Sequence, residues 1–216
     1  MQVKSFLGGF DKNLSYLLWC SETRLASLID PAVEPLQIFE FIESNNLILE
    51  KILITHTHKD HVYYLNDFIN QFPLLNIYCY SNPENKFCND YIGLQHNQVI
   101  SVGKSLLTAI HTPGHLSDSI CYWCKELEFI FTGDTIFIGR TGRTVSKGSN
   151  IKDLYNSVYN IILKIPPETI IYPGHHYGFS KYDTISFNIK NSAFFQCKNE
   201  DEFIEVMNKF EKNRKK

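Results

Sequence analysis

The sequence predicts an α/β fold, and two observations support this prediction. Short apolar runs bounded by turn residues, which are typical of strands, alternate with segments whose apolar residues recur at helical spacing. In addition, four of the apolar runs lead through a turn to a histidine or an aspartate. The order strand, helix, strand is characteristic of proteins in which helices cover a largely parallel sheet.

The first third of the chain is expected to form strands and one helix. NLSYLLW (13–19) and RLASLID (24–30) predict strands, and the turn at Asp30-Pro31 ends the second. PLQIFEFIES (35–44) carries apolar residues at helical spacing, so it predicts a helix. The apolar run KILIT (51–55) then predicts the next strand.

The remaining elements continue the same alternation. A helix is expected over 61–72, and five short strands follow at 76–80, 97–102, 105–111, 118–124 and 128–133. Segment 150–165 places its apolar residues on one helical face, with Asn150 as the N-cap and Pro166-Pro167 at the end. A strand is predicted at 168–174 and a last helix at 199–216, with an apolar face and a basic end.

Composition excludes several classes of protein. The chain has 216 residues and 44% hydrophobic residues, so it can bury the core of one domain, expected over 1–216 with a short helical extension from about residue 184. A net charge of -2 argues against nucleic-acid partners and membrane surfaces. No signal peptide or transmembrane run is visible, and the six cysteines are irregularly spaced. We therefore expect a soluble, reduced, cytoplasmic protein.

The candidate ligands gather in THTHKDH (55–61) and after three later strands. His56 and His58 leave a strand end at positions i and i+2, so both side chains can point the same way. We predict one half-site of His56, His58 and His115, and a second of Asp60, His61 and His175, with Asp134 shared between them. Imidazole and carboxylate ligands suit Zn, Fe or Mn. Two such ions about 3.5–4 Å apart can lower the pKa of a shared water, giving the hydroxide nucleophile of a hydrolase.

Four motifs in this order carry a family resemblance: THTHKDH, TPGH (112–115), FTGDT (131–135) and YPGH (172–175). The chain resembles the metallo-β-lactamase superfamily from roughly residue 5 to residue 212, and within it glyoxalase II (hydroxyacylglutathione hydrolase) and persulfide dioxygenase. The resemblance implies a four-layer αββα sandwich. It also implies that Asp30 supports the histidine loop from behind the ligands.

Two further residues are candidates for substrate contact. Arg143, in the loop GRTGR (139–143), falls where glyoxalase II has a basic residue that contacts glutathione, and Tyr177 falls near a tyrosine with a similar role. A bidentate pair with a substrate carboxylate would suit this arginine, although an exposed loop arginine is an equally good interpretation. His96 and His111 are expected to be structural, and the role of His176 stays open. The CxxC motif Cys121–Cys124 lies in a predicted strand, where its two sulfurs would point to opposite faces.

Two functions from this family compete. The first is a thioester hydrolase acting on S-acyl glutathione or a related small molecule with two divalent metals, most simply Zn, and with Asp60 and Asp134 as catalytic carboxylates. The second is a dioxygenase that acts on glutathione persulfide through a single Fe held by His56, His115 and Asp134. Only 41 residues follow His175, which favours the dioxygenase, whereas the complete second half-site favours the hydrolase. The enzyme is expected to be a monomer or a homodimer.

Overall fold

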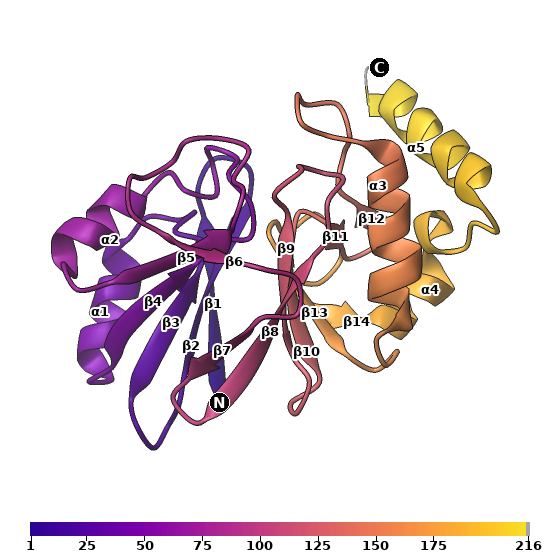
Figure 1. The fold of residues 1–216 in the computed structure, drawn as a ribbon. Helices are drawn as coiled ribbons and strands as arrows, with labels where there is room; N and C mark the ends of the chain where they lie inside the picture. Colours follow the sequence, from indigo (N-terminus) through magenta and orange to yellow (C-terminus); the bar gives the residue numbers. More distant parts are fainter. Residues whose placement is uncertain (215–216) are drawn as a thin grey trace.

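Two six-stranded sheets pack face to face, with helices on both outer faces (Figure 1). The computed structural model describes residues 1–214, so the last two residues of the predicted C-terminal helix lie outside the described part of the chain. Helices α1 and α2 cover the outer face of the first sheet, and α3, α4 and α5 cover that of the second (Figure 1). The predicted αββα sandwich is confirmed.

The first sheet has the order β1-β2-β3-β4-β5-β6. It is antiparallel from β1 to β3 and parallel from β3 to β6, which agrees with a hairpin-rich start followed by crossover connections. Its strands are β1 (Gln2–Gly8), β2 (Asn13–Trp19), β3 (Leu25–Ile29), β4 (Ile48–Leu53), β5 (Asn76–Tyr80) and β6 (Ile92–Leu94), and its helices are α1 (Leu36–Ser44) and α2 (Leu65–Gln71).

The second sheet has the order β14-β13-β10-β9-β8-β7, with β10 and β13 parallel. Its strands are β7 (Val99–Val102), β8 (Ser105–His111), β9 (Ile120–Cys124), β10 (Phe129–Gly133), β13 (Ile170–Pro173) and β14 (Asp183–Thr184). A separate small hairpin, β11 (Ile136–Phe137) and β12 (Arg140–Thr141), follows β10. The helices of this half are α3 (Ile151–Asn156), α4 (Ile185–Asn191) and α5 (Glu200–Arg214).

Hydrophobic side chains fill three layers of core. The central layer lies between the sheets and contains the ring of Phe131 stacked on that of Tyr172, with the ring of Tyr16 tilted against both. The outer two layers lie under α1 and α2 and under α3 to α5. Strand β9 shows the alternation that links them, because Cys124 joins the central layer and Cys121 the layer under α3. The two cysteines therefore face opposite sides of the sheet, as predicted.

Most of the predicted elements are present, but five strands and two helices differ from the prediction. Strands β1, β6, β11, β12 and β14 were not predicted. The helix expected from residue 61 begins only at Leu65, because the preceding residues form the turns that carry His61. The helix expected over 150–165 is α-helical only to Asn156 and continues as a π turn (Ser157–Ile161) and a 3-10 turn (Ile162–Lys164). The widened turn starts at Ser157, whose hydroxyl donates to the carbonyl of Pro113 at 2.6 Å.

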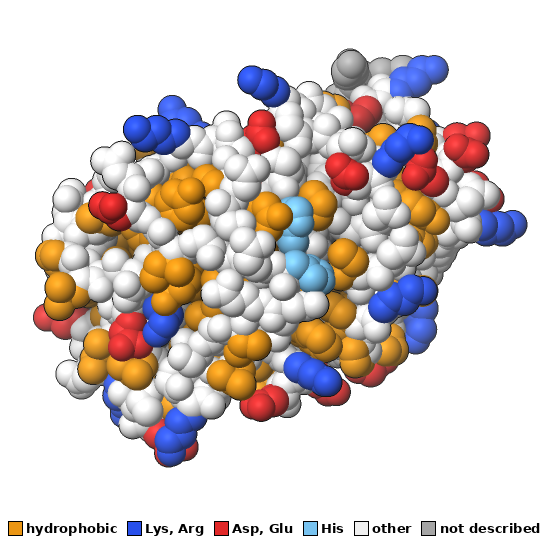
Figure 2. Space-filling view, in the orientation of Figure 1, with side chains coloured by type: hydrophobic (Ala, Val, Ile, Leu, Met, Phe, Trp, Pro, Cys, Tyr) orange, Lys and Arg blue, Asp and Glu red, His pale blue; other side chains and the backbone are white. Residues whose placement is uncertain are grey.

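The surface shows no charge field of one sign on the face drawn in Figure 2. Positive and negative side chains are interspersed there, with hydrophobic side chains between them. Within residues 1–214, every helix is too short or too polar to cross a membrane.

Candidate metal centre

The seven predicted ligands come together at one end of the two sheets. His56, His58, Asp60 and His61 lie in the loop after β4, and the other three follow β8, β10 and β13. Their donor atoms form three overlapping groups, within each of which all donor atoms lie within 4.8 Å of one another. Their convergence is a finding of the structure, whereas their role as ligands stays a prediction.

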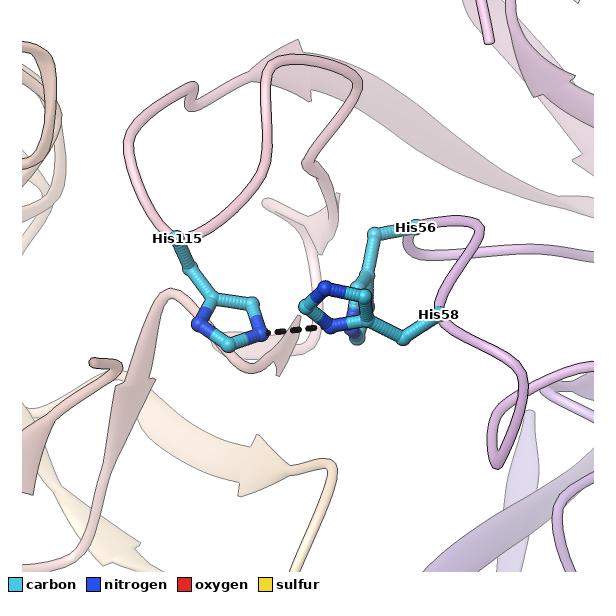
Figure 3. Close-up of side chains that lie close together, drawn as sticks. All are labelled: His56, His58 and His115. Carbon is cyan, nitrogen blue, oxygen red and sulfur yellow. Dashed lines mark hydrogen bonds between the residues drawn. The ribbon is translucent and has the colours of Figure 1, made fainter. Parts of the chain in front are cut away.

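The first group consists of His56, His58 and His115. Figure 3 shows the three rings pointing toward one another, two from the loop after β4 and one from the loop after β8. Nδ1 of His58 lies 3.0 Å from Nε2 of His56 and 2.9 Å from Nε2 of His115. Three imidazole nitrogens that face a common point provide one face of a tetrahedral metal site.

The second group consists of Asp60, His61 and His175. Nε2 of His61 and Nε2 of His175 are 3.2 Å apart, and Oδ2 of Asp60 lies 3.4 Å from Nε2 of His175. The side chain of Asp60 is one-third exposed, while both imidazoles are buried. This group therefore meets the solvent at its carboxylate.

Asp134 lies between the two groups. Its Oδ1 is 3.2 Å from Nε2 of His61, and its Oδ2 is 3.5 Å from Nε2 of His115 and 3.4 Å from Nε2 of His175. Gly174 makes this position possible, because a Cβ there would lie 2.5 Å from Oδ1 of Asp134 and 2.7 Å from Cε1 of His61. A carboxylate in this place can contact ions on both sides.

A layer of hydrogen bonds fixes the rings from behind. The ring Nδ1–H of His61 donates to Oδ2 of Asp30 at 2.8 Å. The same carboxylate accepts the backbone N–H of Thr55 at 2.7 Å and its hydroxyl at 2.6 Å. Asp30 therefore lies behind the histidine loop and supports it, as the resemblance implied.

Three further imidazoles are oriented in the same manner. Nδ1 of His56 contacts the Thr55 hydroxyl, Nδ1 of His115 donates to the carbonyl of Arg143, and Nδ1 of His175 donates to the carbonyl of Asp11. With Nδ1 protonated, Nε2 of each ring carries the free lone pair and points into the site.

The electrostatics of the two groups differ. Burial, and then the neighbouring His115, lower the pKa of His58 to about 4, so this ring is neutral near pH 7. Burial also lowers the pKa of His175, but the charge of Asp134 and hydrogen bonds to Asp134 and Asp60 outweigh it and raise the pKa to about 9. Burial raises the pKa of Asp134, yet the charges of His175 and His61 outweigh it and leave the pKa well below its usual range.

The donor set fits divalent metal ions. Six imidazole and carboxylate groups surround Asp134, and its buried Oδ1 accepts no well-aligned hydrogen bond from the described residues, although Nε2 of His61 lies 3.2 Å away. A buried acceptor without a partner is costly, and a cation removes that cost. Nε2 atoms of two rings facing each other at 3.2 Å are likewise explained by a cation held between them.

The two predicted substrate contacts border the same cavity, whose volume is about 190 Å³. Tyr177 stacks on the ring of His175, and its hydroxyl donates to Oδ2 of Asp11 at 2.6 Å. Arg143 donates through Nε and Nη2 to the two carboxylate oxygens of Glu211 on α5, both at 2.6 Å. That Arg143 and Tyr177 contact a substrate stays a prediction.

Three histidines lie outside the groups just described. His111 stacks on Tyr80 with ring centroids 3.9 Å apart, and its Nε2 donates to the carbonyl of Ser117. Nδ1 of His96 accepts the backbone N–H of His111. These contacts agree with the structural roles expected for both residues. The backbone N–H of His176 donates to the carbonyl of Lys12, and its ring is partly buried.

Sequence reasoning did not identify three residues that border the site. Asn13 is buried and donates through Nδ2 to Oδ2 of Asp60 at 2.9 Å. The carbonyl of Asp11 orients His175, and Arg140 lines the cavity. An asparagine at the start of an otherwise apolar strand was the one available signal. The other two contacts depend on how loops distant in sequence meet.

Comparisons of this chain with known proteins agree on one family. Residues 8–175 match the family described as Metallo-beta-lactamase superfamily. A probable polyketide biosynthesis zinc-dependent hydrolase, BaeB, from Bacillus velezensis is 31% identical over 94% of this chain and 89% of its own length. A hydroxyacylglutathione hydrolase from Francisella tularensis subsp. novicida is 31% identical over 90% of this chain and 75% of its own.

Among solved structures, that of ETHE1 from Myxococcus xanthus is similar in fold, with a TM-score of 0.87 and 26% identity over 97% of this chain and 91% of the other.

Proposed function

Because the chain belongs to the metallo-β-lactamase superfamily, we propose that it is a metallohydrolase that cleaves thioesters such as S-acyl glutathione at a site for two divalent ions. Within the superfamily the chain fits the subgroup that resembles glyoxalase II and persulfide dioxygenase. The relatives named hydroxyacylglutathione hydrolase and zinc-dependent hydrolase support hydrolysis, and zinc is the metal we propose.

The completeness of the second group carries this proposal. Asp60, His61 and His175 each have a partner that orients the side chain toward the shared point: Asn13 for Asp60, Asp30 for His61, and the carbonyl of Asp11 for His175. These contacts hold all three side chains in the orientation that a second ion would need. Two sites that share Asp134 suit a hydrolase with two ions.

The seven residues of the candidate centre would have distinct roles in hydrolysis. His56, His58 and His115 would hold one ion, Asp60, His61 and His175 the other, and Asp134 both. When bound, the ions supply a coordinated water of lowered pKa and positive charge beside the substrate carbonyl. Burial raises the pKa of Asp60, but hydrogen bonds from His175 and Asn13 and the charge of His61 outweigh it. Its carboxylate therefore stays ionised at the cavity and can accept a hydrogen bond from the attacking water.

The thiolate that leaves from a thioester needs little protonation. A thiol has an ordinary pKa of about 8.5, so a thiolate leaves without being fully protonated. A site built of histidines and carboxylates therefore suits a thioester.

The test is elemental analysis of protein purified without chelators or affinity metals, followed by an assay of S-acyl glutathione hydrolysis. We expect two ions per chain, chiefly zinc, and metal-dependent release of thiol. A single iron per chain and no thiol release would contradict the proposal.

A mononuclear iron dioxygenase that acts on glutathione persulfide is the second candidate, supported by the fold likeness to ETHE1. It would use His56, His115 and Asp134 alone. The substitution His58→Ala separates the two, because it should abolish hydrolysis at a two-ion site while oxygen consumption with a persulfide at a single iron would persist.

A further inference from the structure

An arginine that sequence motifs did not single out lies in the wall of the cavity at the candidate metal centre, with no hydrogen-bond or ion-pair partner among residues 1–214. We propose that Arg140 binds an oxyanion, a carboxylate or a phosphate, at the end of the thioester remote from the scissile bond. This inference rests on the proposed function and names the substrate class as thioesters of an anionic thiol carrier. The cavity that it lines also contains His58, Asp60, His115, Asp134 and His175.

The neighbouring arginine is already occupied. Arg143 forms a two-pronged pair with Glu211, with both N–O distances at 2.6 Å, and this pair ties the loop to α5. This pair occupies the Nε–Nη2 edge of the guanidinium, so only its Nη1 side remains for another anion. Arg143 is therefore engaged in holding the loop to α5 and has less freedom than Arg140 to turn toward a substrate.

The guanidinium of Arg140, unlike that of Arg143, forms no salt bridge within the described residues. The structure contains no hydrogen bond or ion pair between its guanidinium and any of residues 1–214, and its Nε is buried without a partner. The guanidinium lies over the ring of Tyr177 at 4.0 Å and over the rings of Phe137 and Phe210 at 5.2 Å. Stacking on aromatic faces holds the plane of the group while leaving its N–H edge available. A buried N–H without a partner is costly, and an incoming oxyanion would remove that cost.

The backbone that carries Arg140 is fixed from below. The buried side chain of Asn188 accepts the backbone N–H of Gly139 at 2.7 Å and donates to the carbonyl of Phe137 at 2.8 Å. The hydroxyl of Ser192 donates to the carbonyl of Gly139 at 2.8 Å. The β11–β12 hairpin is thereby held on both sides of its turn, so the arginine is pre-positioned rather than recruited on binding.

The charge distribution of the cavity agrees with an anionic ligand at this wall. Asp60 and Asp134 belong to the candidate metal centre, where cations would neutralise them, and Asp11 accepts the hydroxyl of Tyr177. Arg214 of α5 lines the same cavity. With the metal centre filled, Arg140 and Arg214 leave the outer wall positive, which favours an anion there.

The experiment compares three thioesters that share one acyl group and differ at the end of the thiol carrier: a free carboxylate, a phosphate monoester, or a neutral amide. The variants are Arg140→Met, which keeps the apolar stem that packs on the rings, and Arg140→Lys, which restores a point charge. Lys104→Gln is the matched control, since it removes an exposed cation that pairs with Glu22. Thermal unfolding and metal content establish that each variant is folded and loaded.

In the wild type we expect at least one of the anionic thioesters to be hydrolysed with a kcat/KM about tenfold or more above that of the amide, mainly through KM. Arg140→Met should lower kcat/KM for the preferred anionic thioester toward that for the amide, Arg140→Lys should restore part of the preference, and Lys104→Gln should keep it. The preferred anion identifies the source as carboxylate or phosphate. Equal preference ratios in the wild type and Arg140→Met would overturn the inference.

A binding measurement keeps the two proposals separable. Thioether analogues of the same compounds, which cannot be hydrolysed, are titrated by calorimetry into the metal-loaded wild type and Arg140→Met. If the wild type prefers the anionic thioether and the variant does not, the role of Arg140 stands even where no thioester is cleaved, and only the proposed hydrolysis fails. If thioesters are cleaved but neither protein prefers the anion, the hydrolysis stands and the role of Arg140 fails.

Discussion

At the scale of single residues, the carboxylate of Asp30 shows how a side chain that would touch neither metal nor substrate shapes the candidate centre. It accepts two hydrogen bonds from Thr55 and one from His61, and it is almost wholly buried. Because Thr55 also contacts Nδ1 of His56, one carboxylate orients a ring in each half-site. The turn that places it requires Asp30 itself to adopt a φ of 49°, a conformation that aspartate tolerates better than most residues.

Replacing Asp30 by alanine should therefore weaken both the fold and the metal site. We expect Asp30→Ala to lower the free energy of unfolding by roughly 3 kcal/mol, since three buried donors lose a charged acceptor. The affinity for zinc should fall by about 10- to 100-fold. Urea denaturation and competitive zinc titration measure the two effects. Glu43→Ala, at an exposed carboxylate in α1, should change neither by much, and an unchanged zinc affinity in Asp30→Ala would contradict its orienting role.

Gly174 gives a second test at this scale. In Gly174→Ala, the new methyl group would meet Oδ1 of Asp134 and the ring of His61, so we expect loss of bound metal without a requirement for global unfolding. Metal content by elemental analysis is the measurement. Gly139→Ala is the control: a φ of 85° strains alanine by about 1 kcal/mol, yet nothing lies within 4 Å of the added Cβ, so its metal content should stay that of the wild type. Full metal content in Gly174→Ala would show that Asp134 can move freely.

At the scale of elements, α3 connects the metal loops with the C-terminal helix. Its N-cap, Asn150, accepts the backbone N–H groups of Lys152 and Asp153, as the sequence predicted. The backbone N–H of Asn150 also donates to the carbonyl of Gly114, just before His115. Gly114 lies so close to α3 that a Cβ would come within 2.3 Å of the backbone of Leu154. The start of this helix is thus packed directly against the TPGH turn.

Asn150→Ala should lower the free energy of unfolding by about 1 kcal/mol, because two N–H groups at the start of the helix lose their acceptor. Chemical denaturation provides the value. Asn150→Ser and Asn150→Asp keep a capping oxygen and should lie close to the wild type. Asn160→Ala, on the exposed side of the same segment, should have little effect. A loss in the serine variant equal to that in the alanine variant would assign the effect to something other than capping.

At the scale of the whole molecule, the candidate metal centre joins the two halves of the sandwich. His56, His58, Asp60 and His61 belong to the half built on the first sheet, and His115, Asp134 and His175 to the half built on the second. An ion bound between them would bind only the folded chain, because the unfolded chain separates these groups by up to 119 positions. Metal binding and global stability are therefore coupled.

Zinc at about 100 times its dissociation constant should raise the free energy of unfolding by about 2.7 kcal/mol. For a chain of this size, Tm should rise by about 5–10 °C relative to protein stripped with a chelator. Thermal unfolding at a series of free zinc concentrations measures the dependence. In a His115→Ala/His175→Ala variant, which lacks one predicted ligand of each group, the zinc-dependent rise should disappear. A similar rise in this variant would place the stabilising zinc elsewhere.

Much of this protein follows from local pattern. Strands such as Asn13–Trp19 and the N-cap at Asn150 could be predicted because alternation and capping depend on neighbouring residues. Strand β1 was not predicted because only Phe6 of its seven residues is buried at this sheet edge, and β6 because it has only three residues. The break after Asn156 could not be predicted, since it coincides with a contact between Ser157 and the distant Pro113.

The α/β class, most of the elements and the seven residues that converge could be predicted from the sequence, because each predicted ligand lies in a loop that follows an apolar strand and strand ends meet at one edge of a sheet. The difference between the two arginines of GRTGR depends on tertiary contacts. Arg143 is paired because α5 brings Glu211 to it, whereas Arg140 has no hydrogen-bond or ion-pair partner among residues 1–214 and lies over the ring of Tyr177. The sequence of the loop does not distinguish Arg140 from Arg143. The residues that they contact are distant in sequence and come near only in the folded chain.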